Sequence, residues 1–179
     1  MKFVALLRGV NVGGSRKVEM KRLKSLFESL RYRNVTTYVH SGNVMFESDV
    51  KRETLQNDIP KKLKKEFGFA VQALVKTKHE IKNIADAIPQ RWKNDAEQKT
   101  DVAFLFPAID SKNIVDALPV KKEFIDVRYV KGALIWNVRR TEYNKSRLNK
   151  IIGLKQYQYM TVRNVTTVRF LAGEKKTKT

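Results

Sequence analysis

The sequence contains no cysteine and only two histidines among its 179 residues. Without cysteine the chain has no disulfide framework, no thiol nucleophile and no thiolate ligand for structural zinc. The two histidines, His40 and His79, are not accompanied by clustered carboxylates, so a dedicated metal site is not expected either. The sequence therefore predicts no metal and no cofactor.

Long apolar runs are also missing. No stretch approaches the roughly 20 apolar residues that cross a bilayer. The apolar run after Lys2 is short and is followed by Arg8, so no signal peptide is evident. We therefore expect a cytoplasmic protein with no membrane partner. Its 42% hydrophobic and 31% charged residues are typical of a globular chain with a real core.

Acidic residues are scarce beside basic ones. The 18 Asp and Glu residues stand against 37 Lys and Arg, which gives a formal net charge of +19. An anionic partner is the natural expectation, and the pairs Lys61-Lys62 and Lys64-Lys65 would attract phosphates with little sequence preference. The alternative is a solvated basic surface, because the charges are spread along the whole chain. The sequence does not indicate whether the protein is a monomer or an oligomer.

A glycine-rich basic loop, Arg8–Lys17, follows the apolar run Phe3–Leu7 and precedes an amphipathic stretch from Glu19 to Leu30. The uninterrupted apolar run indicates a strand that is covered on both faces, and the amphipathic stretch indicates a helix. Glycines in such a loop favour positive φ or close approach of the backbone to a neighbour, and amides at a helix start favour anions. The loop is thus either an anion cradle or simply a turn that required glycine.

Two nucleotide-binding motifs do not fit this loop. Gly9 and Gly14 have the spacing of a phosphate-binding loop, but Ser15 stands where that motif requires lysine. The Gly-x-Gly-x-x-Gly fingerprint of dinucleotide-binding folds cannot be read here either. We therefore reject both motifs.

The first half of the chain predicts the element order β-α-β-β-α-β, the split arrangement of a ferredoxin-like sheet. After the first strand and helix, the expected elements are the strands Val35–Val39 and Val44–Phe46, a helix Lys51–Phe67 and a strand Phe69–Val75. Pro60 predicts a kink or break in the second helix, and Gly68 predicts its end.

A hairpin turned at Ser41-Gly42 would place Val39 opposite Val44 and His40 opposite Asn43. A right-handed crossover makes the first two strands parallel. The glycine-rich loop and the hairpin tip are therefore expected at the same edge of the sheet.

The second half echoes the first. Its expected elements are a strand Val102–Phe106, a short helix Asp110–Leu118, a hairpin of Phe124–Val130 and Ala133–Val138 turned at Lys131-Gly132, and helices Asn144–Ile152 and Thr161–Ala172. The predicted fold class is α+β, with two ferredoxin-like β-α-β-β-α halves packed together. The expected boundaries are 1–76 for the first half, 77–98 for a connecting helix and loop, 99–173 for the second half with its C-terminal helix, and 174–179 for a mobile basic tail.

Three stretches carry a family resemblance: Phe3–Gly14, Thr37–Phe46, and Thr161–Asn164 with Thr167-Val168. On these motifs the chain resembles the bacterial "domain of unknown function 1697" family. The third motif is looser, because Val165 stands where the family usually has tryptophan. The resemblance implies a bacterial cytoplasmic α+β protein with ferredoxin-like halves, and it implies no known reaction.

The resemblance also marks mostly polar or glycine positions as candidate ligand-binding residues. They are Arg8, Asn11, Gly13, Gly14, Ser41, Gly42, Asn43, Thr161, Arg163 and Asn164. We expect the amides around Gly13 and Gly14 and the guanidinium of Arg8 to bind an anionic ligand, either a phosphate-bearing small molecule or a nucleic-acid backbone. A helix starting at Thr161 is expected to bring its amides and Arg163 to the same anion.

Three alternatives stay open. Arg8 and Asn43 could only brace the loop against the hairpin. The basic surface, with Tyr38 for stacking, could bind nucleic acid generally. The chain could also be an enzyme, since His40 stands beside the hydroxyl of Ser41, although adjacent residues of a strand point to opposite faces.

Overall fold

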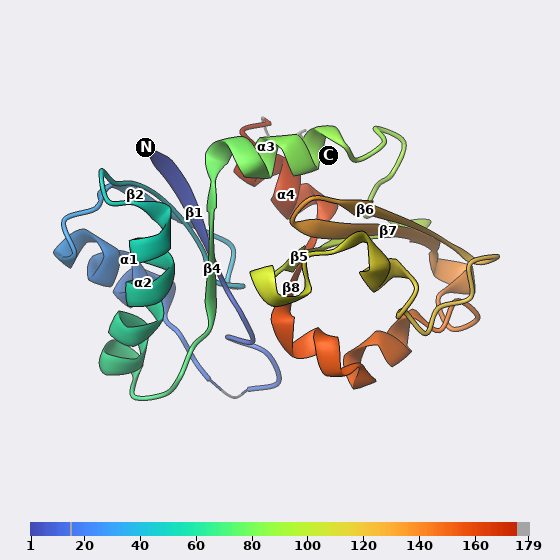
Figure 1. Cartoon of the computed structure of the whole chain (residues 1–179), viewed down its shortest axis with the longest axis horizontal. Helices are drawn as coiled ribbons and strands as arrows, with labels where there is room; N and C mark the ends of the chain where they lie inside the picture. Colours follow the sequence, from blue (N-terminus) through green and yellow to red (C-terminus); the bar gives the residue numbers. More distant parts are fainter. Residues whose placement is uncertain (15, 175–179) are drawn as a thin grey trace. The chain divides into compact units, whose positions relative to one another are not determined.

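The computed structural model describes residues 1–14 and 16–174, which form two compact units that divide after Ile81 (Figure 1). Each unit contains one four-stranded sheet in which all paired strands are antiparallel. The predicted α+β class is confirmed. The expected mobile tail lies, beyond Glu174, outside the described residues.

The first unit has the predicted order of strands and helices. Its elements are β1 (Lys2–Leu7), α1 (Met20–Ser29), β2 (Arg33–Tyr38), β3 (Asn43–Glu47), α2 (Arg52–Phe67) and β4 (Ala73–Thr77), followed by α3 (Lys78–Asp86). The strands lie in the order β2-β3-β1-β4. Figure 1 shows α1 and α2 on the same face of this sheet.

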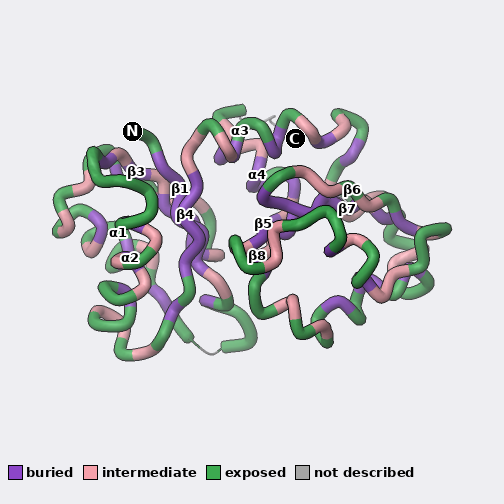
Figure 2. Tube along the Cα trace, in the orientation of Figure 1, coloured by how far each residue is buried: buried purple, intermediate pink, exposed green. Residues whose placement is uncertain are grey.

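The core of the first unit forms between that face and the two helices. Phe3, Ala5 and Leu7 alternate along β1 and pack in one cluster with Phe27 of α1 and Ile59 of α2. As expected of a covered strand, β1 is buried from Phe3 to Leu7, and Figure 2 shows the buried course of β1 and β4.

Helix α2 continues through Pro60 and ends at Gly68, whose φ of 78° is left-handed. The expected end is confirmed, and a break at Pro60 is wrong.

The side chain of Gln56 ties this helix to the edge strand β4, because its Nε2 donates to the Ala73 carbonyl at 2.7 Å and its Oε1 accepts from the Val75 amide at 2.8 Å. The fourth strand begins at Ala73, whereas the sequence predicted that it would begin at Phe69.

The second unit has strands in the order β6-β7-β5-β8. Its elements are β5 (Gln98–Leu105), β6 (Ile125–Val130), β7 (Ala133–Arg139), β8 (Met160–Asn164) and α4 (Val165–Ala172). Val130 pairs with Ala133, which confirms the hairpin turn at Lys131-Gly132. The first strand of this unit begins at Gln98, earlier than predicted.

Short 3₁₀ turns replace two predicted helices in this unit. They are η2 (Lys112–Val115) in place of the helix 110–118 and η4 (Leu148–Gly153) in place of the helix 144–152. Further 3₁₀ turns are η1 (Pro107–Ile109), η3 (Arg140–Glu142) and η5 (Lys155–Tyr159). Ser111 is extended and caps η2 through its side chain, so the chain cannot form one helix there.

The predicted helix Thr161–Ala172 is present from Val165 to Ala172, but its predicted start at Thr161 is wrong. Thr161 and Arg163 belong to β8, where they pair with Phe104 and Val102 of β5. The β-branched residues of this stretch therefore serve a strand, which the local pattern could not distinguish from a helix. Helix α4 begins only at Val165, after Asn164.

Candidate functional site

The glycine-rich loop and the hairpin tip of the first unit meet at one edge of the sheet. The amide of Leu7 donates to the Gly42 carbonyl at 2.8 Å, and Nδ2 of Asn11 donates to the His40 carbonyl at 2.7 Å. The predicted convergence of these two segments is confirmed. Arg8 is half-buried at the end of β1, and its amide donates to the Gln72 carbonyl at 2.8 Å.

The side chain of Asn11 forms the brace between the two segments. Its Oδ1 accepts from the Val18 amide at 2.8 Å, while Nδ2 donates to the carbonyls of Val18 at 2.9 Å and of His40. Asn11 also has a φ of 56°, in the left-handed region that asparagine tolerates better than most residues. Both polar atoms of Asn11 thus hold the loop in shape, a bracing role that the sequence had suggested for Arg8 and Asn43 and not for Asn11.

The hairpin register differs from the predicted one. Tyr38 pairs with Asn43 and Thr37 with Val44, so the turn runs from Val39 to Gly42. Nδ2 of Asn43 donates to the Tyr38 carbonyl at 2.9 Å and to Oγ of Ser41 at 3.0 Å, which closes this longer turn. Val39 therefore lies in the turn, where it is 46% exposed, and not in a strand opposite Val44.

The marked glycines serve two different purposes. A Cβ on Gly42 would lie 2.7 Å from Cβ of Leu7 and 2.8 Å from Cγ2 of Val10, so close packing as well as its φ of 73° requires glycine. Gly13 and Gly14 also have positive φ, but no described atom lies within 4 Å of a Cβ built on either. Their backbone is exposed at the surface of the loop.

A hollow of about 610 Å³ lies beside this loop at the start of α1. Gly14 and His40 contribute to its lining together with the exposed Lys17 and Lys21. Glu19, also in the lining, is the N-cap residue of α1, and its side chain makes no capping hydrogen bond. The first amides of α1 therefore receive no capping bond from the side chain of Glu19, and such a helix start can bind an anion.

The enzyme alternative finds little geometric support. His40 lies in the turn beside Ser41, and not in a strand opposite Asn43 as the sequence predicted. The imidazole of His40 is exposed and makes no hydrogen bond with any residue that the structure describes. A nucleophile paired with a base is not formed here.

The remaining marked residues belong to the second unit. Arg163 is buried, and its Nη1 donates to Oγ1 of Thr161 at 3.0 Å and to the Val162 carbonyl at 2.8 Å. Burial lowers the pKa of Arg163 to about 10, so the guanidinium is still charged at neutral pH. Asn164 is the N-cap of α4, accepting from the Thr167 amide at 2.8 Å. That these residues meet the loop of the first unit stays a prediction.

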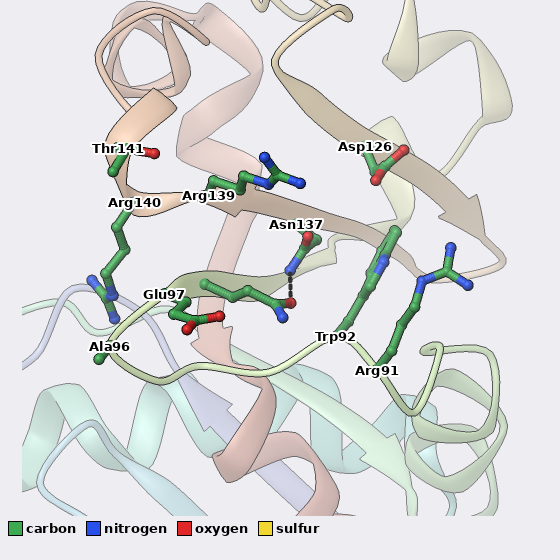
Figure 3. A pocket seen from close by; sticks show the side chains of 10 residues that line it. Arg91, Trp92, Ala96, Glu97, Asp126, Asn137, Arg139, Arg140 and Thr141 are labelled. Atoms are coloured by element: carbon green, nitrogen blue, oxygen red, sulfur yellow. Dashed lines mark hydrogen bonds between the residues drawn. The ribbon is translucent and has the colours of Figure 1, made fainter.

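A second cavity, of about 620 Å³, lies entirely within the second unit (Figure 3). Sequence reasoning missed it, because its wall combines the segment before β5 with the polar faces of β5, β6 and β7. Arg139 and Asp126 lie on either side of Asn137 in this pocket, as Figure 3 shows. Trp92 completes the wall, with the guanidinium of Arg128 5.0 Å from the centroid of its ring.

A chain of hydrogen bonds fixes the amide groups on the floor of this pocket. The hydroxyl of Thr100 donates to the Lys93 carbonyl at 2.6 Å and accepts from Nδ2 of Asn137 at 2.7 Å. Nδ2 of Asn137 also donates to Oε1 of Gln98 at 2.9 Å, and the Lys93 amide donates to the same oxygen at 3.3 Å. Because the Lys93 carbonyl can only accept and its amide can only donate, the direction of every bond in the chain is determined.

The described residues include no group of three or more His, Asp or Glu side chains that could hold a metal ion. Within the same residues no helix is both long and apolar enough to cross a membrane.

The protein is thus an α+β protein that consists of two units, each with one antiparallel sheet. In the first unit a glycine-rich loop is braced against the tip of a hairpin. The chain belongs to the family described as "Protein of unknown function (DUF1697)", which it matches over residues 1–136. This confirms the resemblance in the first two motifs, whereas Thr161, Arg163 and Asn164 lie beyond the matched region.

A solved structure shares the fold. It is described as "the structure of conserved bacterial protein SP0830 from Streptococcus pneumoniae", with a TM-score of 0.83 and 21% identity over 96% of each chain. At that identity the likeness concerns the fold alone. No curated protein matches the chain.

Proposed function

We propose that the first unit binds a phosphate-bearing small molecule in the hollow between the glycine-rich loop and the start of α1. The observation that carries this proposal is the combination of exposed Lys17 and Lys21 with a helix start whose N-cap, Glu19, makes no side-chain capping bond. The exposed backbone of Gly14 allows a phosphate to approach without meeting a side chain.

Different residues then carry different parts of this function. Asn11, Asn43 and Gly42 shape the loop and the turn, because their polar or steric capacity is used within the protein. Lys17 and Lys21 supply charge to the ligand, and His40 lines the side formed by the hairpin tip. Glu19 opposes an anion, so Glu19→Gln is expected to tighten binding.

The test is a thermal-shift screen with inorganic phosphate, nucleoside mono- and diphosphates and sugar phosphates. A ligand at 100 times its Kd stabilises the folded state by about 2.7 kcal/mol. The double variant Lys17→Ala/Lys21→Ala should lose the shift. The control Lys62→Ala/Lys65→Ala removes the same charge from exposed positions of α2 and should keep it. Equal loss in both variants, or no shift with any compound, would refute the proposal.

A specific feature of the second unit favours nucleic-acid binding as a second candidate. No acidic residue occurs between Glu142 and Glu174, while Lys145, Arg147 and Lys150 in this stretch are exposed. Such a surface would bind nucleic acid through its backbone, with an affinity that falls steeply as salt rises. Binding of labelled RNA and DNA at two salt concentrations tests this candidate, and no binding at low salt would exclude it.

The strand order supports a finer description of the fold. We infer that the first unit is ferredoxin-like, because its β-α-β-β-α-β elements form an antiparallel sheet in the order β2-β3-β1-β4. The second unit repeats this strand order as β6-β7-β5-β8, with 3₁₀ turns where a ferredoxin-like unit has its helices.

A further inference from the structure

The polar pocket of the second unit offers ligand groups that the protein itself does not use. Oε1 of Gln98 accepts two hydrogen bonds, and both hydrogens of Asn137 Nδ2 are donated within the network. This leaves Nε2 of Gln98 as a donor and Oδ1 of Asn137 as an acceptor, neither with a partner among the described residues. The donor matches a peptide C=O and the acceptor matches an ammonium group, and the buried Thr100 helps to hold both in place.

Charges of both signs flank this amide pair. Arg139 is the cross-strand neighbour of Gln98, and Asp126 is the cross-strand neighbour of Asn137. Both charged side chains line the pocket and are exposed, and within the described chain neither forms an ion pair. A ligand with a carboxylate at one end and an ammonium group at the other would satisfy both.

The spacing of these groups indicates the length of the ligand. Arg139 and Asn137 are two residues apart on β7, which corresponds to roughly 7 Å along a strand. Two residues of extended peptide also span roughly 7 Å. The volume of about 620 Å³ accommodates such a ligand with its side chains.

We propose that this pocket binds a short zwitterionic peptide of about two residues. Its peptide C=O accepts from Nε2 of Gln98, and its terminal ammonium donates to Oδ1 of Asn137, the cross-strand neighbour of Asp126. Its terminal carboxylate pairs with Arg139, and its terminal ammonium pairs with Asp126. The site is separate from the phosphate site proposed for the first unit, so either one can fail without the other.

The test follows the side-chain amide signals of Gln98 and Asn137 by ¹H–¹⁵N NMR during titration of the whole chain with alanyl-alanine up to about 10 mM, ten times a Kd of 1 mM. Both signals should move with the dipeptide. Acetylating its amino end or amidating its carboxyl end should each weaken binding about tenfold.

Variants assign the two ends. Arg139→Gln should bind alanyl-alanine about tenfold more weakly but bind its amidated form as the wild type does, because the carboxylate contact is already gone. Asp126→Asn should likewise bind alanyl-alanine about tenfold more weakly but bind its acetylated form as the wild type does, because the ammonium contact is already gone. Lys131→Gln and Glu123→Gln, which change exposed charges of this unit outside the pocket lining, should bind as the wild type.

Three results would overturn the proposal: no movement of the two amide signals, equal binding of the doubly blocked dipeptide, or movement caused by nucleotides and not by the dipeptide.

Discussion

Asn11 and His40 are joined by a hydrogen bond of 2.7 Å although 29 positions separate them in the sequence. The bond connects the loop after β1 to the turn between β2 and β3, and the Asn11 side chain continues to the Val18 backbone just before α1. One asparagine thus holds together the hairpin tip and both sides of the loop. Its place in the family motif is explained by this geometry without any contact to a ligand.

Asn11→Ala should therefore lower the free energy of unfolding. The change removes hydrogen bonds to the Val18 amide and carbonyl and to the His40 carbonyl, and we expect a loss of about 1–3 kcal/mol. Urea unfolding measures it. Val12→Ala is the matched control, since Val12 is 67% exposed in the same loop, and its stability should stay close to that of the wild type. A loss in Val12→Ala as large as in Asn11→Ala would contradict the bracing role.

Gly42→Ala should be much more damaging than Gly14→Ala, although both residues have positive φ. Left-handed backbone alone costs an alanine about 1–2 kcal/mol. At Gly42 the new methyl group also meets Leu7 and Val10 at under 3 Å, which raises the expected loss to about 2–5 kcal/mol. Thermal or urea unfolding of the two variants compares them directly. Equal losses would mean that the contact between turn and loop relaxes at no cost.

Asn164→Ala should destabilise the second unit through the loss of a helix cap. Its Oδ1 accepts from the Thr167 amide at the start of α4, and removing such a cap costs about 1 kcal/mol. Asn164→Asp retains an oxygen acceptor and should recover most of the stability. If Asn164→Ala were as stable as the wild type, its place in the third motif would need another explanation.

Local patterns predicted those parts of the fold that depend on neighbours in sequence. The buried run Phe3–Leu7, the glycine stop at Gly68 and the turn at Lys131-Gly132 all follow from side-chain periodicity or turn chemistry. The hairpin register was missed by contrast, because it depends on the bonds of Asn43 across the turn and on the packing of Gly42 against Leu7. Neither contact leaves a periodic signal.

Pairing between residues far apart in the sequence also accounts for the incorrect predictions in the second unit. Thr161 joins a strand because it pairs with Phe104, far away in the sequence. The pocket depends on Asn137 meeting Gln98 and Thr100, which are 39 and 37 positions away. The polar residues Gln98 and Thr100, two positions apart at the start of β5, were the available signal, but their role became readable only once the neighbouring strand was known.

Acid should weaken the turn before β5 through Asp95. The amides of Gln98 and Glu97 donate to its Oδ1 at 2.8 and 3.0 Å and hold the pKa of this carboxyl below its ordinary value of 3.8. A carboxyl with a lowered pKa in the folded state stabilises the protein above pH 3.8, and this contribution disappears as the pH falls through the lower, folded value. Wild type should therefore exceed Asp95→Ala in unfolding free energy by a constant amount from pH 7 to about pH 5, and the difference should shrink below pH 3.8.

Asp95→Asn keeps an oxygen acceptor without a charge, so the difference between Asp95→Asn and Asp95→Ala should not change with pH. Urea unfolding of the three proteins at several pH values provides the measurement. A wild-type advantage that persists unchanged at pH 3 would show that the neutral hydrogen bonds, and not the charge, stabilise this turn.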